Sequence, residues 1–181
     1  MNPARIILRM AGWSVHCSVP DYPKCIICVA PHTSNWDFIV GKLAYASLGR
    51  KAGFLMKQSW FFWPLGCLWR AIGGVPVPRG KQRGGSLIAL LTERFRQSRR
   101  LTLAITPEGT RSRTSAWHTG FLRIAREAQV PVVLGVLDFE NRKVLLERTF
   151  TPGDSIEADL RAIKDYYRPF KGLYPEKFTA E

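Results

Sequence analysis

The chain has 181 residues, 46% of them hydrophobic, so the sequence predicts a single domain over residues 1–181 with one substantial core. Its formal net charge of +13 lies in residues 1–150, because residues 151–181 are close to neutral. Four cysteines are too few for a disulfide framework, and no apolar run reaches the roughly 18 residues of a membrane-spanning helix. A basic body attracts nucleic acid, anionic membranes, acidic carrier proteins or phosphorylated substrates, and charge alone does not choose among them.

The N-terminal stretch, residues 1–16, reads MNPARIILRMAGWSVH and predicts a short amphipathic helix. It lacks the uncharged core and the cleavage site of a signal peptide. One side would be apolar and the other basic, with Ile6, Ile7, Met10 and Trp13 opposite Arg5 and Arg9. Two roles stay open for this helix: packing against the body of the domain, or contact with a membrane surface.

Farther along the chain, apolar strand-like runs alternate with helical periodicities. Strands are expected at residues 25–30, 52–57, 73–78, 101–106 and 130–139, a hairpin at 140–143 leading into a strand at 144–150, and helices at about 35–48, 86–98, 119–128 and 155–167. This alternation with short links predicts an α/β domain with a mainly parallel central sheet flanked by helices. We see no interior linker long enough to divide it.

The pair Cys25 and Cys28 lies in the run KCIICVA and has a spacing also found in metal sites. Residues three apart on a strand point to opposite faces, however, and no second Cys/His pair follows. The sequence therefore predicts two buried thiols and no metal.

A candidate acid/base pair follows the first long strand, in the stretch HTSNWD. His32 and Asp37 are five residues apart, about 140° around an ideal helix, so they would not meet on one helix. If His32 lies in the strand-to-helix loop and Asp37 in the first helical turn, the carboxylate can accept one imidazole N–H and leave the other nitrogen as a base. The alternative is that His32 and Ser34 only cap a helix whose dipole Asp37 complements.

A second polar loop, PEGTRSR, follows the strand at 101–106. Gly109 permits a tight backbone, Thr110 offers a hydroxyl, and Arg111 offers the fork-shaped donors that suit a phosphate. Glu108 would repel an anion, so we expect it to accept from substrate hydroxyls or to orient an arginine. The alternative is a solvated basic turn. If the two strands run parallel, this loop and HTSNWD reach the same edge of the sheet.

Two further segments stand out between these loops. The stretch GGVPVPRGKQRGG lacks the Ser or Thr that follows the lysine of a nucleotide-binding phosphate loop, and Arg79 is its candidate anion ligand. Residues 57–74 hold five aromatic side chains between Lys57 and Arg70: Trp60, Phe61, Phe62, Trp63 and Trp69. Aromatic and basic residues together suit a bilayer interface, and packing in the core is the alternative.

Four of these stretches, in this order over residues 28–137, resemble the conserved blocks of the glycerophospholipid acyltransferases, the family of glycerol-3-phosphate and 1-acylglycerol-3-phosphate acyltransferases. HTSNWD resembles their H-x-x-x-x-D box, GGVPVPRG their second block, TPEGTRS their P-E-G-T-R-S block, and VPVV at 130–133 the fourth. Departures are Thr106, where the family commonly has Phe, and Pro78, where many members carry an acidic residue.

The resemblance implies an enzyme with the acyltransferase α/β fold that moves a fatty acyl group from acyl-CoA or acyl-carrier protein to the hydroxyl of 1-acylglycerol-3-phosphate, giving phosphatidic acid for phospholipid biosynthesis. His32 and Asp37 would be catalytic, and the acceptor would be bound by Arg79, Glu108, Gly109, Thr110 and Arg111. It implies no metal and no cofactor. We expect a peripheral enzyme on the cytoplasmic side of an anionic membrane, with no nucleic acid partner.

Alternatives stay open at this point. The same chemistry can act on glycerol-3-phosphate, a lysophospholipid or an amino-lipid. The other class is a basic nucleic-acid-binding domain without enzymatic activity. The run RFRQSRR at 94–100 favours this class, although basic residues on the polar side of a helix usually form a solvated face.

Overall fold

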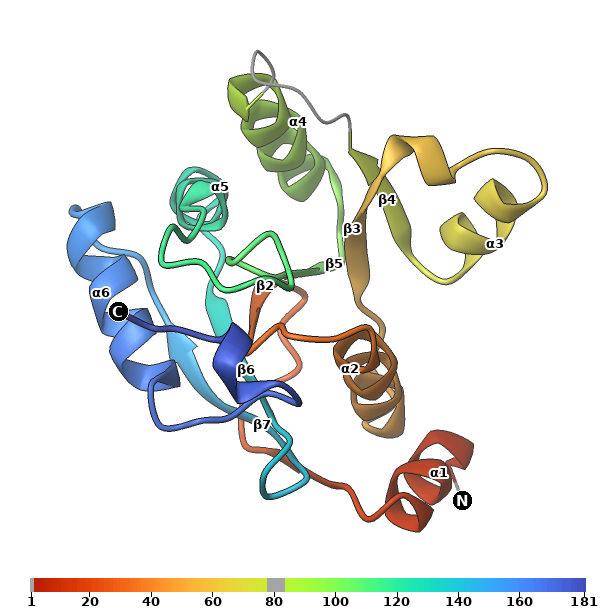
Figure 1. The fold of residues 1–181 in the computed structure, drawn as a ribbon. Helices are drawn as coiled ribbons and strands as arrows, with labels where there is room; N and C mark the ends of the chain where they lie inside the picture. The colour runs from red at the N-terminus through yellow and green to blue at the C-terminus, as the bar shows by residue number, and fades with distance from the viewer. Residues whose placement is uncertain (1, 78–83) are drawn as a thin grey trace.

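The computed structural model describes residues 2–77 and 84–181 (Figure 1). The helices are α1 (Pro3–Met10), α2 (Trp36–Ser47), α3 (Leu65–Ala71), α4 (Gly84–Gln97), α5 (Gly120–Ala128) and α6 (Ile156–Tyr167), with 3-10 turns η1 (Gln58–Trp60) and η2 (Pro175–Lys177). The strands are β1 (Ser14–Cys17), β2 (Lys24–Ala30), β3 (Gly53–Lys57), β4 (Gly74–Val77), β5 (Leu101–Ile105), β6 (Val132–Asp138) and β7 (Lys143–Phe150).

The described strands form one sheet in the order β1-β7-β6-β2-β5-β3-β4. All neighbouring pairs are parallel except β6 and β7, which are joined by the short turn predicted at 140–143 and run antiparallel. Parallel pairs need crossover connections, and helices supply them along most of the chain. The predicted α/β domain with a mainly parallel sheet is confirmed.

Helices cover both faces of this sheet (Figure 1). One face packs against α4, α5 and α6, and the other against α1 and α2. The α4–α6 side holds the larger core cluster, which includes Ile26, Cys28, Leu103, Val132, Phe95, Phe121, Leu122, Ile163 and Tyr167. The fully buried Tyr167 hydroxyl donates to the carbonyl of Cys28 at 2.6 Å, so α6 is fixed to the central strand β2 by a bond as well as by packing.

The two cysteines of the CIIC run lie on opposite faces of β2. Cys28 belongs to the core cluster under α4–α6, whereas Cys25 packs in a separate cluster with Tyr45 and Val133 on the other face. Burial raises the pKa of both thiols, which keeps them neutral and unreactive. Both cysteines are buried, as the sequence predicts.

Strand register brings the two polar loops to one edge of the sheet. Cys28 of β2 pairs with Ile105 of β5, so the loops that start at Pro31 and Thr106 leave the sheet side by side. Parallel strands deliver their following loops to the same edge, and this edge is where α/β proteins bind ligands. The fold therefore juxtaposes HTSNWD and PEGTRSR.

Two parts of the chain differ from the sequence-based expectation. The helix predicted for residues 1–16 ends at Met10, because Gly12 turns the chain with φ 77° and Ser14–Cys17 then pair with β7 as an edge strand. Helix α3, in the aromatic-rich segment, was not predicted; it begins after Pro64 and lies beyond the outer strand β4 (Figure 1). The other predicted strands and helices are confirmed to within two residues at each end.

None of the helices described here is both long and apolar enough to cross a bilayer.

Candidate active site

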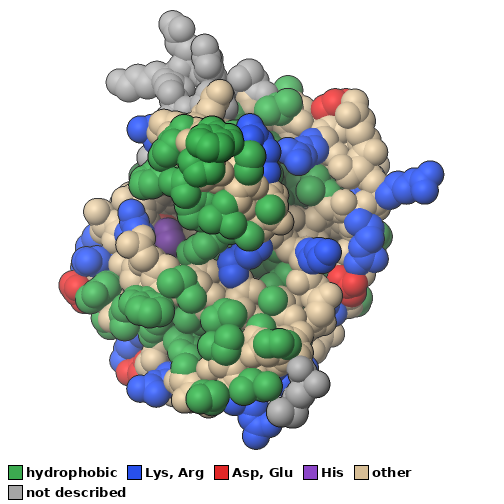
Figure 2. Space-filling view, turned by 90° about the vertical axis from the view of Figure 1, so that its right-hand side faces the viewer, with side chains coloured by type: hydrophobic (Ala, Val, Ile, Leu, Met, Phe, Trp, Pro, Cys, Tyr) green, Lys and Arg blue, Asp and Glu red, His purple; other side chains and the backbone are tan. Residues whose placement is uncertain are grey.

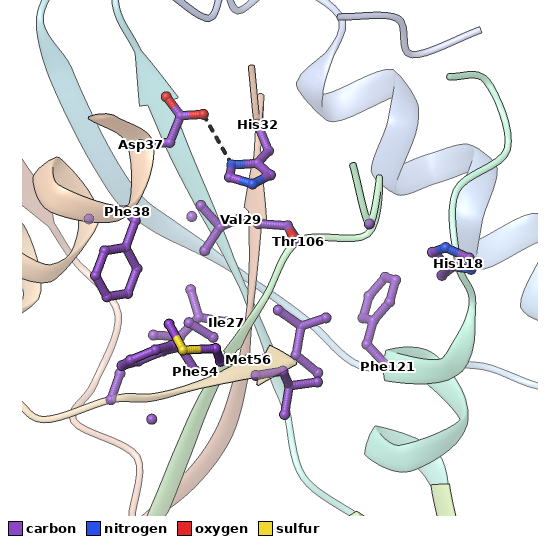
Figure 3. Close-up of a pocket in the computed structure, with 18 of the residues that line it drawn as sticks. Ile27, Val29, His32, Asp37, Phe38, Phe54, Met56, Thr106, His118 and Phe121 are labelled. Carbon is purple, nitrogen blue, oxygen red and sulfur yellow. Dashed lines mark hydrogen bonds and ion pairs between the residues drawn. The ribbon is translucent and has the colours of Figure 1, made fainter. Parts of the chain in front are cut away.

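His32 and Asp37 meet across the strand-to-helix turn that follows β2. His32 lies in the loop and Asp37 is the second residue of α2, and Nδ1 of the imidazole is 3.1 Å from Oδ2 of the carboxylate (Figure 3). The placement of the two residues on either side of the turn is confirmed. Their catalytic roles stay predictions.

The carboxylate of Asp37 is buried, and several donors converge on it. Its Oδ2 accepts the backbone N–H groups of Thr33 at 2.7 Å and Ser34 at 2.8 Å, and its Oδ1 accepts the Ser34 hydroxyl at 2.6 Å. Because these groups all donate, Asp37 acts as an acceptor, and Nδ1 of His32 must carry the hydrogen that it shares with Oδ2. The other imidazole nitrogen, Nε2, is left as a proton acceptor, and the side chain of His32 is 20% exposed.

The capping alternative does not describe this loop. The N-cap of α2 is Asn35, and its side chain makes no capping hydrogen bond. Ser34 bonds to Asp37 through both its hydroxyl and its N–H, so the polar residues of HTSNWD orient the carboxylate behind the histidine.

Glu108 links the second loop to the first. Its side chain is buried, and Oε1 accepts the backbone N–H of His32 at 2.8 Å. Burial raises the pKa of this carboxyl to about 8, the nearby charge of Asp37 adds to the rise, and the His32 bond opposes it. Glu108 therefore holds the main chain of the histidine loop, a contact that its place in the sequence did not predict; its predicted contact with the acceptor stays a prediction.

The turn after Glu108 lines a cleft that His32 and Asp37 also line. Gly109 has φ 63°, a left-handed conformation that favours glycine, and Thr110 and Arg111 follow it on the exposed surface. Gly109, Thr110 and Arg111 line a cleft together with His32 and Asp37. The structure thus brings together six of the seven predicted site residues, counting Glu108 through its bond to His32; Arg79 lies outside the described residues.

The cleft has a volume of about 1140 Å³ and passes between the sheet and the helices. Much of its lining is apolar, and Figure 3 shows Ile27, Val29, Phe38, Phe54, Met56 and Phe121 among the residues that line it. Its described lining includes the cationic side chains of Lys42, Lys57, Arg111 and Arg123, against the single carboxylate of Asp37. The arrangement combines a base, a site for an anion and space for a hydrocarbon chain.

The Acyltransferase family model matches residues 18–134, the part of the chain that contains the histidine loop and the turn at 107–113. The chain belongs to the Acyltransferase family. It is therefore an enzyme that transfers acyl groups, and family membership implies an acyl donor and a lipid acceptor. No curated protein matches this acyltransferase sequence.

A solved structure resembles this acyltransferase over most of its length. It is the crystal structure of the 1-acyl-sn-glycerophosphate (LPA) acyltransferase PlsC from Thermotoga maritima, with a TM-score of 0.58 and 21% sequence identity. The match covers 90% of this chain and 73% of the Thermotoga chain. The two proteins share the α/β acyltransferase fold.

Two contacts in the acyltransferase site were missed by reasoning from sequence. His118 also lines the cleft, and its ring lies against Gly109. The segment after α6 packs on the histidine loop: Gly172 lies against Thr33, and the Tyr174 N–H donates to the Thr33 hydroxyl at 3.2 Å. A histidine directly before a predicted helix was a visible signal for the first contact, whereas nothing local pointed to the second.

Proposed function

We propose that this acyltransferase moves a fatty acyl group from an acyl thioester, acyl-CoA or acyl-carrier protein, to the free hydroxyl of 1-acylglycerol-3-phosphate, giving phosphatidic acid. The observation that carries the proposal is the His32–Asp37 pair, which opens into a cleft that is apolar inside and cationic in much of its polar lining. The resemblance in fold to an LPA acyltransferase supports the choice of acceptor.

The proposed chemistry needs one proton shuttle. Nε2 of His32 takes the proton from the acceptor hydroxyl as its oxygen attacks the thioester carbonyl carbon. The carbon–sulfur bond then breaks, and the imidazolium returns the proton to the leaving thiolate, so atoms and charge balance. Asp37 stabilises the imidazolium and fixes its orientation, and general base catalysis of this kind is worth about 10²–10⁴-fold in rate. The step uses no metal and no cofactor.

The cations of the cleft suit an anionic acceptor. Arg111 is exposed in the turn after Gly109, and its planar guanidinium can bind two phosphate oxygens at once. Lys42 is engaged with the carbonyls of Ala52 at 3.1 Å and Ile72 at 2.8 Å, so it holds the cleft wall together. We assign phosphate binding to the turn of Gly109, Thr110 and Arg111, with Arg79 as a second proposed anion ligand, and the positioning of His32 to Glu108.

The apolar interior of the cleft suits the acyl chain. Gly41 of α2 lines it, and a Cβ built there would meet nothing within 4 Å. The side chains of Ile27, Val29 and Phe54 also line the cleft (Figure 3). Burying hydrocarbon here contributes about 0.8 kcal/mol per methylene group, enough to favour long chains over short ones.

An exposed apolar face supports the proposed peripheral membrane contact. Figure 2 shows apolar side chains gathered over the α3 segment and over the α1 end of one side of the molecule, with basic side chains around them. The most exposed large apolar residues of the α1 segment and of the segment around α3 are Ile7, Met10, Trp60, Phe62, Trp63 and Leu68, and Trp36 at the start of α2 is exposed as well. Phe61 and Trp69 are half-buried, so the aromatic segment has both an inward and an outward side.

We propose that this face rests on an anionic leaflet on the cytoplasmic side. Met10 is 84% exposed and Trp63 is 85% exposed, more than a solvated surface favours for side chains of this size. Aromatic side chains favour the membrane interface, and each nearby Lys or Arg adds about 1 kcal/mol of attraction to anionic lipid.

The experiment that tests the reaction supplies purified protein with long-chain acyl-CoA or acyl-carrier protein and a panel of acceptors, and measures thiol release. The panel holds 1-acylglycerol-3-phosphate, glycerol-3-phosphate, a neutral lysophospholipid and an amino-lipid. We expect release with 1-acylglycerol-3-phosphate and its loss in His32→Ala. His16→Ala is the matched control, because His16 is an exposed histidine on β1, and this variant should keep full activity.

Three results would overturn parts of the proposal. Thiol release that survives His32→Ala refutes the assigned base, and release with another acceptor but not with 1-acylglycerol-3-phosphate refutes the assigned substrate. Flotation with anionic liposomes tests the membrane contact, which Trp63→Gln should weaken. Equal binding to DNA in a filter assay at matched ionic strength would favour a general attraction to polyanions.

A further inference from the structure

The third histidine of the chain, His118, lies in the cleft without a part in the chemistry described so far. It is exposed, and it stands just before α5 across the cleft from His32 (Figure 3). The chain has only three histidines. Nε2 of His16 lies 3.1 Å from the Ser14 hydroxyl oxygen, and Nδ1 of His32 bonds to Asp37. Neither ring nitrogen of His118 has a hydrogen-bond partner in the described part of the chain.

His118 contacts the loop that carries the proposed acceptor-binding turn at two points. Its backbone N–H donates to the carbonyl of Pro107 at 2.7 Å. Its ring lies so close to Gly109 that a Cβ there would come within 2.6 Å of Cδ2 and 2.7 Å of Nε2. The main chain of His118 is thus bonded to this loop, and its ring lies beside the turn that would bind the phosphate.

The neighbours of His118 favour an anionic ligand. The turn that it contacts continues into Thr110 and Arg111, and Arg123 of α5 lines the same cleft. Glu108 is the acidic residue directly before this turn. It is buried, and it accepts a hydrogen bond from the backbone N–H of His32. An imidazole donates through a ring N–H in either protonation state and adds a charge when protonated, so it can complement the guanidinium of Arg111.

We propose that His118 is a substrate-binding residue that donates a ring N–H to the phosphate of the acceptor, beside Arg111. This assignment rests on the proposed function, and it adds a residue outside the four blocks of the resemblance. It places the phosphate on the α5 side of the cleft, with the reacting hydroxyl directed to Nε2 of His32. Specificity for a phosphorylated acceptor would then come from a turn and a fixed imidazole acting together.

The first test observes the imidazole signals directly by NMR at a pH near 7.5. The signals of the three histidines are assigned with His16→Gln, His32→Gln and His118→Gln. Addition of 1-hexanoylglycerol-3-phosphate should change the chemical shifts of the His118 ring, whereas monohexanoylglycerol, which lacks the phosphate, should not. The signals of His16 serve as the internal control and should stay in place with both compounds.

The second test separates binding from chemistry by steady-state kinetics. In His118→Ala the KM for the phosphorylated acceptor should rise about tenfold, as expected for loss of one hydrogen bond to a charged group, with kcat and the KM for the thioester within about twofold. His118→Lys restores a cation at the same position and should recover most of the lost affinity. A purely structural role for the ring would not be rescued by lysine.

The outcomes distinguish this inference from the proposed function. If wild-type protein acylates 1-acylglycerol-3-phosphate and the His118 signals do not respond to the phosphorylated compound, the inference is wrong and the function stands. If His118 responds while only another phosphorylated acceptor is acylated, the inference stands and the assigned substrate is wrong. If no phosphate-bearing compound moves the His118 signals and none is acylated, both are wrong.

Discussion

The two loops of the cleft are held in different ways. In the histidine loop, residues 31–37, the buried carboxylate of Asp37 accepts from three residues, and Glu108 holds the backbone N–H of His32. In the acceptor turn, residues 109–113, the side chains of Thr110 and Arg111 are exposed, and the bond from Ser112 N–H to the Thr110 hydroxyl is local. The first loop is built for fixed geometry, and the second leaves its donors available to a ligand.

This contrast leads to a division of effects between the loops. Changes in the histidine loop and its supports should lower kcat or the free energy of unfolding, because they disturb the base and its buried partners. Changes in the acceptor turn should act mainly on the KM for the acceptor. Substitutions at four positions, Asp37, Glu108, Gly109 and Arg111, test this division.

The largest effect is expected for Asp37→Asn. An amide cannot stabilise the imidazolium of His32 as a carboxylate does, and with its oxygen toward the N–H groups of Thr33 and Ser34 its NH₂ group would take the place of Oδ1, which now accepts the Ser34 hydroxyl. We expect kcat to fall about 10²–10⁴-fold with a smaller change in either KM. Steady-state thiol release measures this, and Asp165→Asn, at an exposed carboxylate on α6, is the matched control. A rise in KM with unchanged kcat would contradict the assigned role.

Glu108 should affect stability in a pH-dependent way. Its pKa is about 8 when folded against 4.5 for the free group, so between these values the folded state keeps a proton that the unfolded state has lost. The resulting stability is complete below pH 4.5 and is lost as the pH rises toward 8, by at most about 1.4 kcal/mol per pH unit.

Glu108→Gln removes this ionisation and keeps an oxygen for the His32 N–H. Urea unfolding from pH 5 to pH 8 should therefore show a flatter pH dependence in Glu108→Gln than in wild type. Glu108→Ala, which leaves the N–H without its acceptor, should cost about 1–3 kcal/mol at pH 5. Parallel pH profiles for wild type and Glu108→Gln would show that the carboxyl is ionised in the folded protein.

Gly109→Ala tests the point where the two loops and His118 meet. A left-handed conformation costs an alanine about 1–2 kcal/mol, and the new methyl group would also displace the His118 ring. We expect a lower melting temperature and a higher KM for the acceptor. The double variant with His118→Ala should regain the part of the stability lost to the clash, but not the affinity. Full additivity of the two substitutions would contradict the contact.

The smallest effect is expected for Arg111→Lys. A lysine keeps the charge but not the planar fork, so the KM for the phosphorylated acceptor should rise by up to about tenfold, and the KM for the thioester should change little. Melting temperature should not change, because Arg111 is exposed. Equal changes in both Michaelis constants would contradict acceptor binding by this residue.

Local sequence patterns predicted most strands and helices and the histidine loop, because these features depend on residues that are close together in the chain. The apolar run that ends at Ala30, the following Pro31 and the helical periodicity beyond it place His32 and Asp37 on opposite sides of a turn. The short edge strand β1 escaped prediction because only pairing with β7 makes Ser14–Cys17 a strand. Helix α3 escaped because Pro64 and the dense aromatic residues hide its periodicity.

The contacts that join the two loops could not be predicted from local sequence either, because they depend on residues that are far apart in the chain. Glu108 and His32 are 76 residues apart, and only the register of β2 with β5 brings them within bonding distance. In sequence Glu108 reads as a ligand for substrate hydroxyls, because nothing there shows that it is buried. The contact of His118 with Gly109 likewise depends on how the chain returns from the turn before α5 begins.

The contact of Thr33 with Gly172 and Tyr174 has a consequence for how the protein is made. Residues near the start of the chain receive part of their support from a segment about 140 residues later, since the Tyr174 N–H reaches the Thr33 hydroxyl. A nascent chain on the ribosome can form β2 and α2 early, but its histidine loop lacks this support until residue 174 has emerged. Enzymatic competence should therefore arise only after residue 174 has left the ribosome.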